Sequence, residues 1–241
     1  MKICVAQIKS IPGDIQQNSA MHIKYVDLAV SFGADAIFFP ELSLTGYEPT
    51  SAVDSAINLG DKRLKIFQNI SDSRHILIGI GAPTKHIDGT SISMVIIQPN
   101  QPKRLYSKQF LHEDEKQYFI SGKKSPLLKI GDHKIAIAIC YEISVPAHCK
   151  NAYEKGANIY LASAAKYSSG IDKTLHKLSQ IADKYSMTVL MSNCIGRADG
   201  KDFAGNSSVW NDNGTLLAQL GNSHEGMLIL DTETQMISEI L

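Results

Sequence analysis

The chain has 241 residues, of which 44% are hydrophobic and 20% charged, and this composition is ordinary for a globular protein. Lysine plus arginine and aspartate plus glutamate both total 24, so the zero formal net charge argues against nucleic acid or an anionic membrane as a partner. The apolar runs are far shorter than the roughly 20 residues that span a bilayer. Met1 and Lys2 lead directly into an apolar strand and not into a signal peptide, so we expect a cytoplasmic protein.

Apolar runs rich in isoleucine, valine and leucine recur along the chain, and several lack the alternation of a strand with one solvent-facing side. We therefore expect strands that are buried on both faces. The predicted strands cover residues 2–8, 36–39, 76–81, 91–98, 134–139, 158–162, 188–193, 207–211, 216–220 and 226–230. Between them, apolar side chains at helical spacing predict helices over residues 16–32 and 171–185. Pro146 in the first turn and Gly156 after the end predict a helix over residues 145–155, and residues 64–71 are a shorter candidate.

Strands and helices alternate through the first two thirds of the chain, whereas the last third, from Ser207, consists mostly of strands joined by turns. This order indicates one α/β domain over residues 1–241, with a mixed sheet whose later strands pair as hairpins. Gly79 and Gly81 have the spacing of the first two glycines of a dinucleotide-binding loop. The third glycine is missing and Pro83 stands where the helix would begin, so we do not predict a nucleotide cofactor.

The four cysteines form no Cys-x-x-Cys pair, so the sequence predicts no zinc or redox site. Cys4 and Cys194 lie in strand-like runs and Cys149 in a predicted helix, and all three are interpreted as packing residues. Cys140 ends the apolar run 135–139, and Tyr141 follows it at once. A core cysteine is one interpretation of Cys140, because free cysteine is often buried. A nucleophile at the mouth of a buried strand is the other.

Two further segments place charged residues after apolar strands. Glu41 follows the apolar run 37–39 and Pro40, and Lys108 follows a short strand-like stretch that leads through an acidic loop to Glu115. Ligand sites in open α/β sheets favour the carboxyl ends of strands. A solvated loop glutamate and a surface charge cluster are the alternative interpretations. We expect His112, in the same loop, to be a polar loop residue and not a metal ligand, because no paired histidine accompanies it.

Taken together, these segments resemble the nitrilase superfamily, the carbon–nitrogen hydrolases, in which a Glu, a Lys and a Cys form a catalytic triad in that chain order. The matching residues are Glu41, Lys108 and Cys140, and Glu115 matches a second active-site glutamate of many members. Residues 193–197 and 203–207 resemble a late Asn…Gly…Phe-x-Gly-x-Ser segment of the family. The resemblance implies a four-layer α-β-β-α sandwich, in which two mixed sheets are flanked by helices.

The resemblance also implies a role for each matched residue. Cys140 would be the nucleophile, and Glu41 the general base, with a pKa raised by burial or by the neighbouring acid Glu115. Lys108 would stabilise the oxyanion, together with the backbone N–H of Tyr141, and would favour the thiolate of Cys140. Neither a metal nor an organic cofactor is implied.

The implied reaction is hydrolysis of a non-peptide carbon–nitrogen bond in a small linear amide, through a cysteine thioester, with release of ammonia or an amine. Hydrolysis of N-carbamoyl amines or nitriles and acyl transfer to an amine are alternatives on the same triad. A non-catalytic binding protein is an alternative of another class. Candidate substrate-binding residues are Tyr47, Tyr118, Tyr141 and Lys166. The resemblance further implies a homodimer, with the helix at residues 145–155 as the expected contact.

Overall fold

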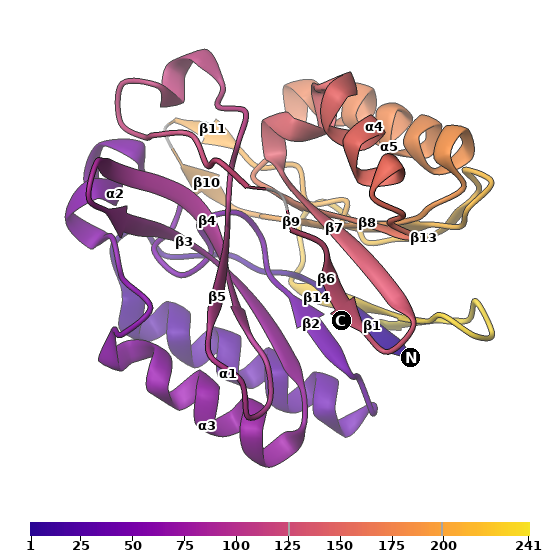
Figure 1. Cartoon of the computed structure of the whole chain (residues 1–241), viewed down its shortest axis with the longest axis horizontal. Helices are drawn as coiled ribbons and strands as arrows, with labels where there is room; N and C mark the ends of the chain where they lie inside the picture. The colour runs from indigo at the N-terminus through magenta and orange to yellow at the C-terminus, as the bar shows by residue number, and fades with distance from the viewer. Residues whose placement is uncertain (125, 199) are drawn as a thin grey trace.

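The computed structural model describes residues 1–124, 126–198 and 200–241. Two mixed sheets lie face to face, and helices cover the outer face of each (Figure 1). The expected four-layer α-β-β-α sandwich is therefore confirmed. Within the described residues, no helix combines the length and apolar character needed to cross a bilayer.

The first sheet has seven strands, and its central strands β1, β2 and β3 run parallel while the outer pairs are antiparallel. Helices α1 (Ile15–Ser31) and α3 (Lys65–Arg74) cover its outer face (Figure 1). In spatial order the strands are β15 (Ile237–Ile240), β14 (Gly226–Asp231), β1 (Lys2–Gln7), β2 (Ala36–Phe38), β3 (Leu77–His86), β4 (Gly89–Ile97) and β5 (Arg104–Ser107).

The second sheet has six strands, and its central strands β7, β8 and β9 run parallel. Helices α4 (Pro146–Glu154) and α5 (Ile171–Tyr185) cover its outer face (Figure 1). In spatial order the strands are β13 (Leu216–Gln219), β12 (Ser208–Trp210), β9 (Thr188–Asn193), β8 (Ile159–Ala164), β7 (His133–Ile139) and β6 (Leu128–Ile130).

Shorter elements complete the described chain. They are helix α2 (Pro49–Ser55), the hairpin of β10 (Arg197–Ala198) and β11 (Lys201–Asp202), and four 3-10 turns, η1 (Lys62–Leu64), η2 (Glu113–Glu115), η3 (Cys140–Ser144) and η4 (Ser168–Gly170). The turns η2 and η3 follow β5 and β7 along the chain. They hold site residues, as described below.

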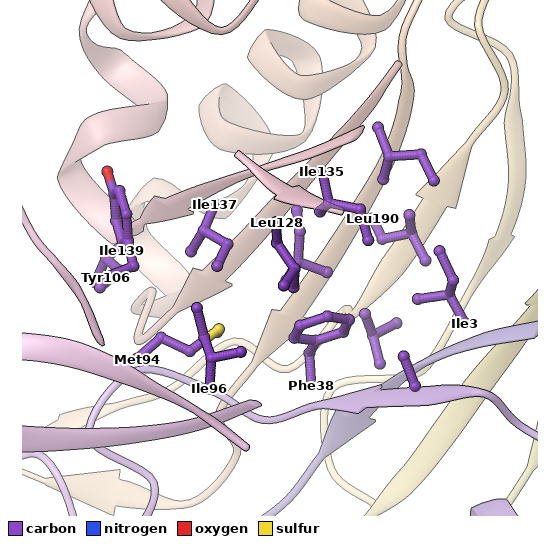
Figure 2. Close-up of a cluster of buried hydrophobic side chains, with 14 of the residues drawn as sticks. Ile3, Phe38, Met94, Ile96, Tyr106, Leu128, Ile135, Ile137, Ile139 and Leu190 are labelled. Carbon is purple, nitrogen blue, oxygen red and sulfur yellow. The ribbon is translucent and has the colours of Figure 1, made fainter. Parts of the chain in front are cut away.

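Apolar periodicity explains why these helices lie flat on the sheets. Ile171, Leu178 and Ile181 of α5 are buried at helical spacing, so one face of the helix packs against the second sheet. A separate apolar layer lies between the two sheets, where Phe38 and Ile96 of the first sheet lie opposite side chains of the second, such as Ile137 (Figure 2). Because both faces of each central strand are covered, the strands read as near-continuous apolar runs.

Two features of the topology differ from expectation. The alternation of strand and helix is interrupted, because β3, β4 and β5 form an antiparallel meander with no helix between them. The late strands do form hairpins, β12 with β13 and β14 with β15, but these hairpins belong to different sheets. The apolar pattern of β14 is compatible with either sheet. Its pairing with β1 joins residues far apart in the sequence, so the local sequence does not encode it.

Candidate active site

Glu41 is held in a loop after β2 that packs closely against β3. The backbone N–H of Leu44 donates to Gly81 O at 2.9 Å, and Leu42 has a left-handed φ of 53°. A Cβ on Gly81 would lie 2.1 Å from Pro40 O, so only glycine lets the strand approach this loop. Gly79 and Gly81 of β3 are therefore needed for close packing against β2 and the loop that follows it. As a result Glu41 is buried, with 1% of its surface exposed.

Lys108 lies directly after β5 and is completely buried. Its backbone is fixed on both sides, because its N–H donates to Ile92 O at 2.8 Å and its carbonyl accepts from Gly122 N at 2.8 Å. The ammonium Nζ lies 2.7 Å from Oε1 of Glu41 and 2.7 Å from Oε1 of Glu115. One buried cation therefore pairs with two buried carboxylates.

Glu115 is the last residue of η2 and is satisfied by three different donors. Its Oε1 accepts from Lys108 Nζ and from the Tyr47 hydroxyl at 3.2 Å, while its Oε2 accepts from the His112 backbone N–H at 2.8 Å. Glu41 differs, since its Oε2 has no hydrogen-bond partner among the described residues. That oxygen of Glu41 is free to take a proton.

Cys140 stands at the first position of η3, immediately after β7, with a left-handed φ of 46°. A positive φ at a residue other than glycine is uncommon and often marks a functional position. The thiol faces a cavity of about 430 Å³ and lies close enough to Glu41 to interact with it. The structure thus brings Cys140, Glu41, Lys108 and Glu115 together from four separate segments.

Burial and charge set the protonation of this cluster. Burial raises the pKa of Glu41, and Glu115 raises it further, while Lys108 lowers it; the net direction is upward, as expected for a buried acid beside another acid. Burial lowers the pKa of Lys108, but its two carboxylates and Cys140 outweigh this effect and raise it. Lys108 is therefore an ammonium group at any ordinary pH.

The pKa of the Cys140 thiol differs from the expectation that Lys108 would favour the thiolate. Burial raises its pKa, the charge of Glu41 raises it further, and Lys166, Lys108 and a backbone hydrogen bond from Ala165 only partly oppose this. The net direction is upward, so the resting residue is a neutral thiol. Its proton must then pass to a nearby base when the substrate binds.

Glu142 is a buried residue whose role the sequence did not indicate. Its Oε1 accepts from the backbone N–H of Gln109 at 2.6 Å, and its Oε2 accepts from Ile139 N at 2.7 Å and from the Tyr106 hydroxyl at 2.8 Å. It therefore ties the loop that carries Lys108 to the turn that carries Cys140. In the sequence, only its position two residues after Cys140 associated it with the site.

The cavity also collects every predicted substrate-binding residue, Tyr47, Tyr118, Tyr141 and Lys166, beside Cys140 and Glu115. Glu41 and Lys108 lie buried behind them. His112 lies on the rim, and no group of three potential metal ligands occurs in the described part of the chain. The cavity is lined by Tyr47, Glu48, Pro49, Thr50, His112, Asp114, Glu115, Gln117, Tyr118, Cys140, Tyr141, Ala165, Lys166, Tyr167, Ser169, Gly170 and Lys201.

Comparison with known proteins decides the family. The Carbon-nitrogen hydrolase family model matches residues 2–240. The chain belongs to the carbon–nitrogen hydrolase family. This confirms the resemblance to the nitrilase superfamily, the carbon–nitrogen hydrolases, and the expectation of an enzyme that hydrolyses carbon–nitrogen bonds. The amidase from Nesterenkonia sp. AN1, described as a member of the nitrilase superfamily, has the same fold, with a TM-score of 0.87 over 98% of this chain and 92% of that chain at 23% identity.

Two curated relatives are similar to this carbon–nitrogen hydrolase in sequence. The 2-oxoglutaramate amidase of Bacillus subtilis is 26% identical over 211 residues, which cover 86% of this chain and 81% of the relative. The glutamine-dependent NAD(+) synthetase of Aquifex aeolicus is 26% identical over 239 residues, which cover 95% of this chain. The chain spans only 41% of the length of that synthetase.

Proposed function

We propose that this carbon–nitrogen hydrolase is an amidase that hydrolyses a small linear amide through a thioester on Cys140. The observation that supports this most directly is the contact of Lys108 with both Glu41 and Glu115 at 2.7 Å, behind a cavity whose floor holds the thiol. The family and the amidase fold agree with this reaction class. The related amidase from Nesterenkonia sp. AN1 also has an active-site cysteine.

In the first half of the proposed reaction, Oε2 of Glu41 takes the proton of the Cys140 thiol as the sulfur attacks the amide carbon. The tetrahedral oxyanion is stabilised by Nζ of Lys108 and by the backbone N–H of Tyr141. The carbon–nitrogen bond then breaks, and Glu41 returns the proton to the leaving nitrogen. Ammonia or an amine departs, and the acyl group remains on the sulfur as a thioester.

In the second half, Glu41 deprotonates a water molecule, which attacks the thioester carbon. Collapse of this second intermediate breaks the carbon–sulfur bond and releases the carboxylic acid, and the proton returns to Cys140. Glu115 holds Lys108 in place and adds to the rise in the pKa of Glu41 that burial causes. The same residues could act on an N-carbamoyl amine or a nitrile, so these substrates belong in any assay.

The reaction needs a free thiol, which suits a reducing compartment. All four cysteines are unpaired. We therefore propose that the reaction takes place in the cytoplasm. Acyl transfer would require an amine to intercept the thioester, and product analysis with added amines separates it from hydrolysis.

The decisive test is Cys140→Ala, with Cys149→Ala as the matched control, since Cys149 is buried in α4 away from the cavity. Ammonia release from a panel of small amides should vanish in the first variant and persist in the second. Mass spectrometry of the unaltered enzyme under turnover should detect an acyl adduct on Cys140. Undiminished ammonia release from the Cys140→Ala variant would contradict the mechanism. If the unaltered enzyme released ammonia from none of the amides, the proposed amidase activity would be contradicted.

A further inference from the structure

We propose that the amide substrate carries a carboxylate, and that Lys166 and Lys201 bind this group in the active-site cavity. The proposal rests on the amidase function described above and names its substrate class. Both lysines line the cavity that contains Cys140. Three features of the described residues support it: a rigid backbone under Lys166, an aromatic wall under Lys201, and the balance of charges in the cavity.

Lys166 follows β8 at the edge of the cavity, and its backbone is held in place. Its N–H donates to Oδ1 of Asn193 at 2.7 Å, and its carbonyl accepts from Ala204 N at 2.8 Å. The side chain is partly buried and lines the cavity together with Cys140, and its charge lowers the pKa of the thiol. A positively charged group that the proposed mechanism does not use thus lies near the reacting sulfur.

Lys201, in β11, lies over an aromatic wall of the same cavity. Its Nζ is 5.2 Å from the centre of the Tyr167 ring, which stacks on Phe203 with ring centres 5.0 Å apart. Tyr47 meets both rings edge-on, at 6.4 and 6.2 Å, and its hydroxyl donates to Glu115. The wall therefore runs from the buried acid to the rim, where Lys201 supplies a second ammonium group.

Some charged side chains that line the cavity have ion-pair partners and others do not. Neither Lys166 nor Lys201 forms an ion pair or a side-chain hydrogen bond with any residue that the structure describes. Among the carboxylates, Glu115 is paired with Lys108, and Asp114 lies 3.4 Å from Nδ1 of His112. Among the described lining residues, Glu48 and Asp114 therefore lack a permanently charged partner, and the Asp114 side chain is 84% exposed to water. Lys166 beside the thiol and Lys201 over the aromatic wall are thus available to attract an anion.

The cavity has room for both ends of such a molecule. Its volume of about 430 Å³ lies in the range typical of small-molecule sites, about 300–1,000 Å³. The carbonyl carbon must sit at Cys140, so the remainder of the substrate extends along the wall towards the lysines. A charge-assisted hydrogen bond to an ammonium group typically changes affinity by about 10–100-fold. We expect an anionic amide to be preferred by that factor over a neutral amide of equal length.

The test compares amides of equal length with and without the charge. Succinamate is matched with butyramide, and glutaramate with valeramide, and the ratio of the two kcat/KM values is the readout. This ratio cancels any common effect of Lys166 on the thiol of Cys140, since both substrates need the same nucleophile. In the unaltered enzyme the ratio should exceed about 10.

The variants are Lys166→Met and Lys201→Met, with Lys173→Met on the exposed face of α5 as the control. In the first two variants the ratio should fall by about 10–100-fold, mainly through a higher KM for the anionic amide. Lys166→Arg should restore part of the preference because it keeps the charge. Lys173→Met should leave the ratio unchanged. A ratio near one in the unaltered enzyme, or an equal loss on both substrates in Lys166→Met, would overturn the proposal.

Binding to the Cys140→Ala variant separates this proposal from the amidase function. Calorimetry should detect glutaramate binding more tightly than valeramide, and the difference should disappear when Lys166→Met is added. If neutral amides are hydrolysed and bound as well as anionic ones, the carboxylate proposal fails while the amidase function stands. If anionic amides bind preferentially through Lys166 but no amide is hydrolysed, the amidase function fails while the binding site stands.

Discussion

At the scale of single residues, the site is a buried cluster in which one ammonium group faces two carboxylates. Burial is the main reason why the pKa of Glu41 is raised and why Cys140 rests as a thiol, and a neighbouring carboxylate adds to each shift, Glu115 for Glu41 and Glu41 for Cys140. A base with a raised pKa is better matched to a thiol than an ordinary carboxylate is. Glu142 is a third buried carboxyl group nearby, held by the N–H of Gln109, the N–H of Ile139 and the Tyr106 hydroxyl.

Glu142 should make the stability of the protein depend on pH. Burial raises its pKa from 4.5 to about 7, although its hydrogen bonds oppose the shift. The folded state thus binds the proton more tightly than the unfolded chain, so the stabilisation is complete below about pH 4.5 and is lost as the pH rises through about 7. The free energy of unfolding attributable to Glu142 should fall by about 3 kcal/mol across this range.

The measurement is the difference in the free energy of unfolding between the unaltered enzyme and Glu142→Gln, from urea titrations at pH 4.5 to 8. The difference is needed because His22 and His148, with pKa values lowered to about 4 by burial, act in the opposite sense in an overlapping range. Both proteins contain His22, so its contribution cancels. His148 lies 3.7 Å from Oε2 of Glu142, so it is replaced by Gln in both proteins to remove its contribution. A difference that does not vary with pH would contradict the assignment. The variant should also lower kcat, because the loops of Lys108 and Cys140 lose their shared acceptor.

At the scale of elements, the site depends on where strands end and on what lies beside those ends. Glu41, Lys108 and Cys140 each follow a strand, but β5 is an antiparallel edge strand while β2 and β7 are parallel to a neighbour. A cross-sheet hydrogen bond from the Ser163 hydroxyl of β8 to Phe39 O, at 3.0 Å, fixes the Glu41 loop against the second sheet. The two sheets therefore position the nucleophile and the base relative to one another.

The close approach of β3 to the Glu41 loop can be tested with Gly81→Ala. The added methyl group would lie 2.1 Å from Pro40 O and 2.6 Å from Leu42 N, which are backbone atoms that cannot rotate away. The loop must shift, and kcat should drop by about 100-fold, since displacements of about 1 Å near reacting groups have effects of this size. Stability should fall by about 1–3 kcal/mol.

The matched control is Gly221→Ala, because a Cβ at Gly221 would meet no atom within 4 Å. Steady-state kinetics and thermal unfolding of the two variants give the comparison. Wild-type kcat in Gly81→Ala would show that the loop accommodates the methyl group without moving Glu41.

At the scale of the whole molecule, the two sheets share one apolar layer, and the helices are left on the outside (Figures 1 and 2). On the helical layer of the second sheet, Tyr153 of α4 is 53% exposed, and its ring lies 5.4 Å from that of Tyr185 in α5. An exposed aromatic pair is the kind of surface that a second copy of the chain could cover. We expect a symmetric homodimer through this layer.

Sedimentation tests this expectation. The unaltered enzyme should sediment at about twice the chain mass of 26.4 kDa, and Tyr153→Glu should shift it towards the monomer because the added charge would be buried in the interface. Ile66→Glu is the control, since Ile66 is 47% exposed on α3 in the opposite helical layer. A monomeric unaltered enzyme, or a dimer that Tyr153→Glu leaves intact, would contradict the proposed interface.

The local sequence was sufficient for most elements, because each apolar run or helical face is encoded within a few neighbouring residues. Helix α5 matches its predicted bounds, and α1 differs by one residue at each end. Helix α2, β6 and β15 were not predicted, since Pro49–Ser55 lacks an apolar helical stripe and Leu128–Ile130 and Ile237–Ile240 are short. The motifs around Glu41, Lys108 and Cys140 also identified the family without any structure.

Only the tertiary structure decided how these residues interact. Lys108 lies 67 positions from Glu41 in the sequence, yet their charged groups are 2.7 Å apart. The neutral resting thiol, the link made by Glu142 and the gathering of Lys166 and Lys201 at one cavity likewise arise from burial or from neighbours distant in the chain. A pKa and an ion pair depend on the local dielectric and on the distance between charges. Both are fixed only when the two sheets close on each other.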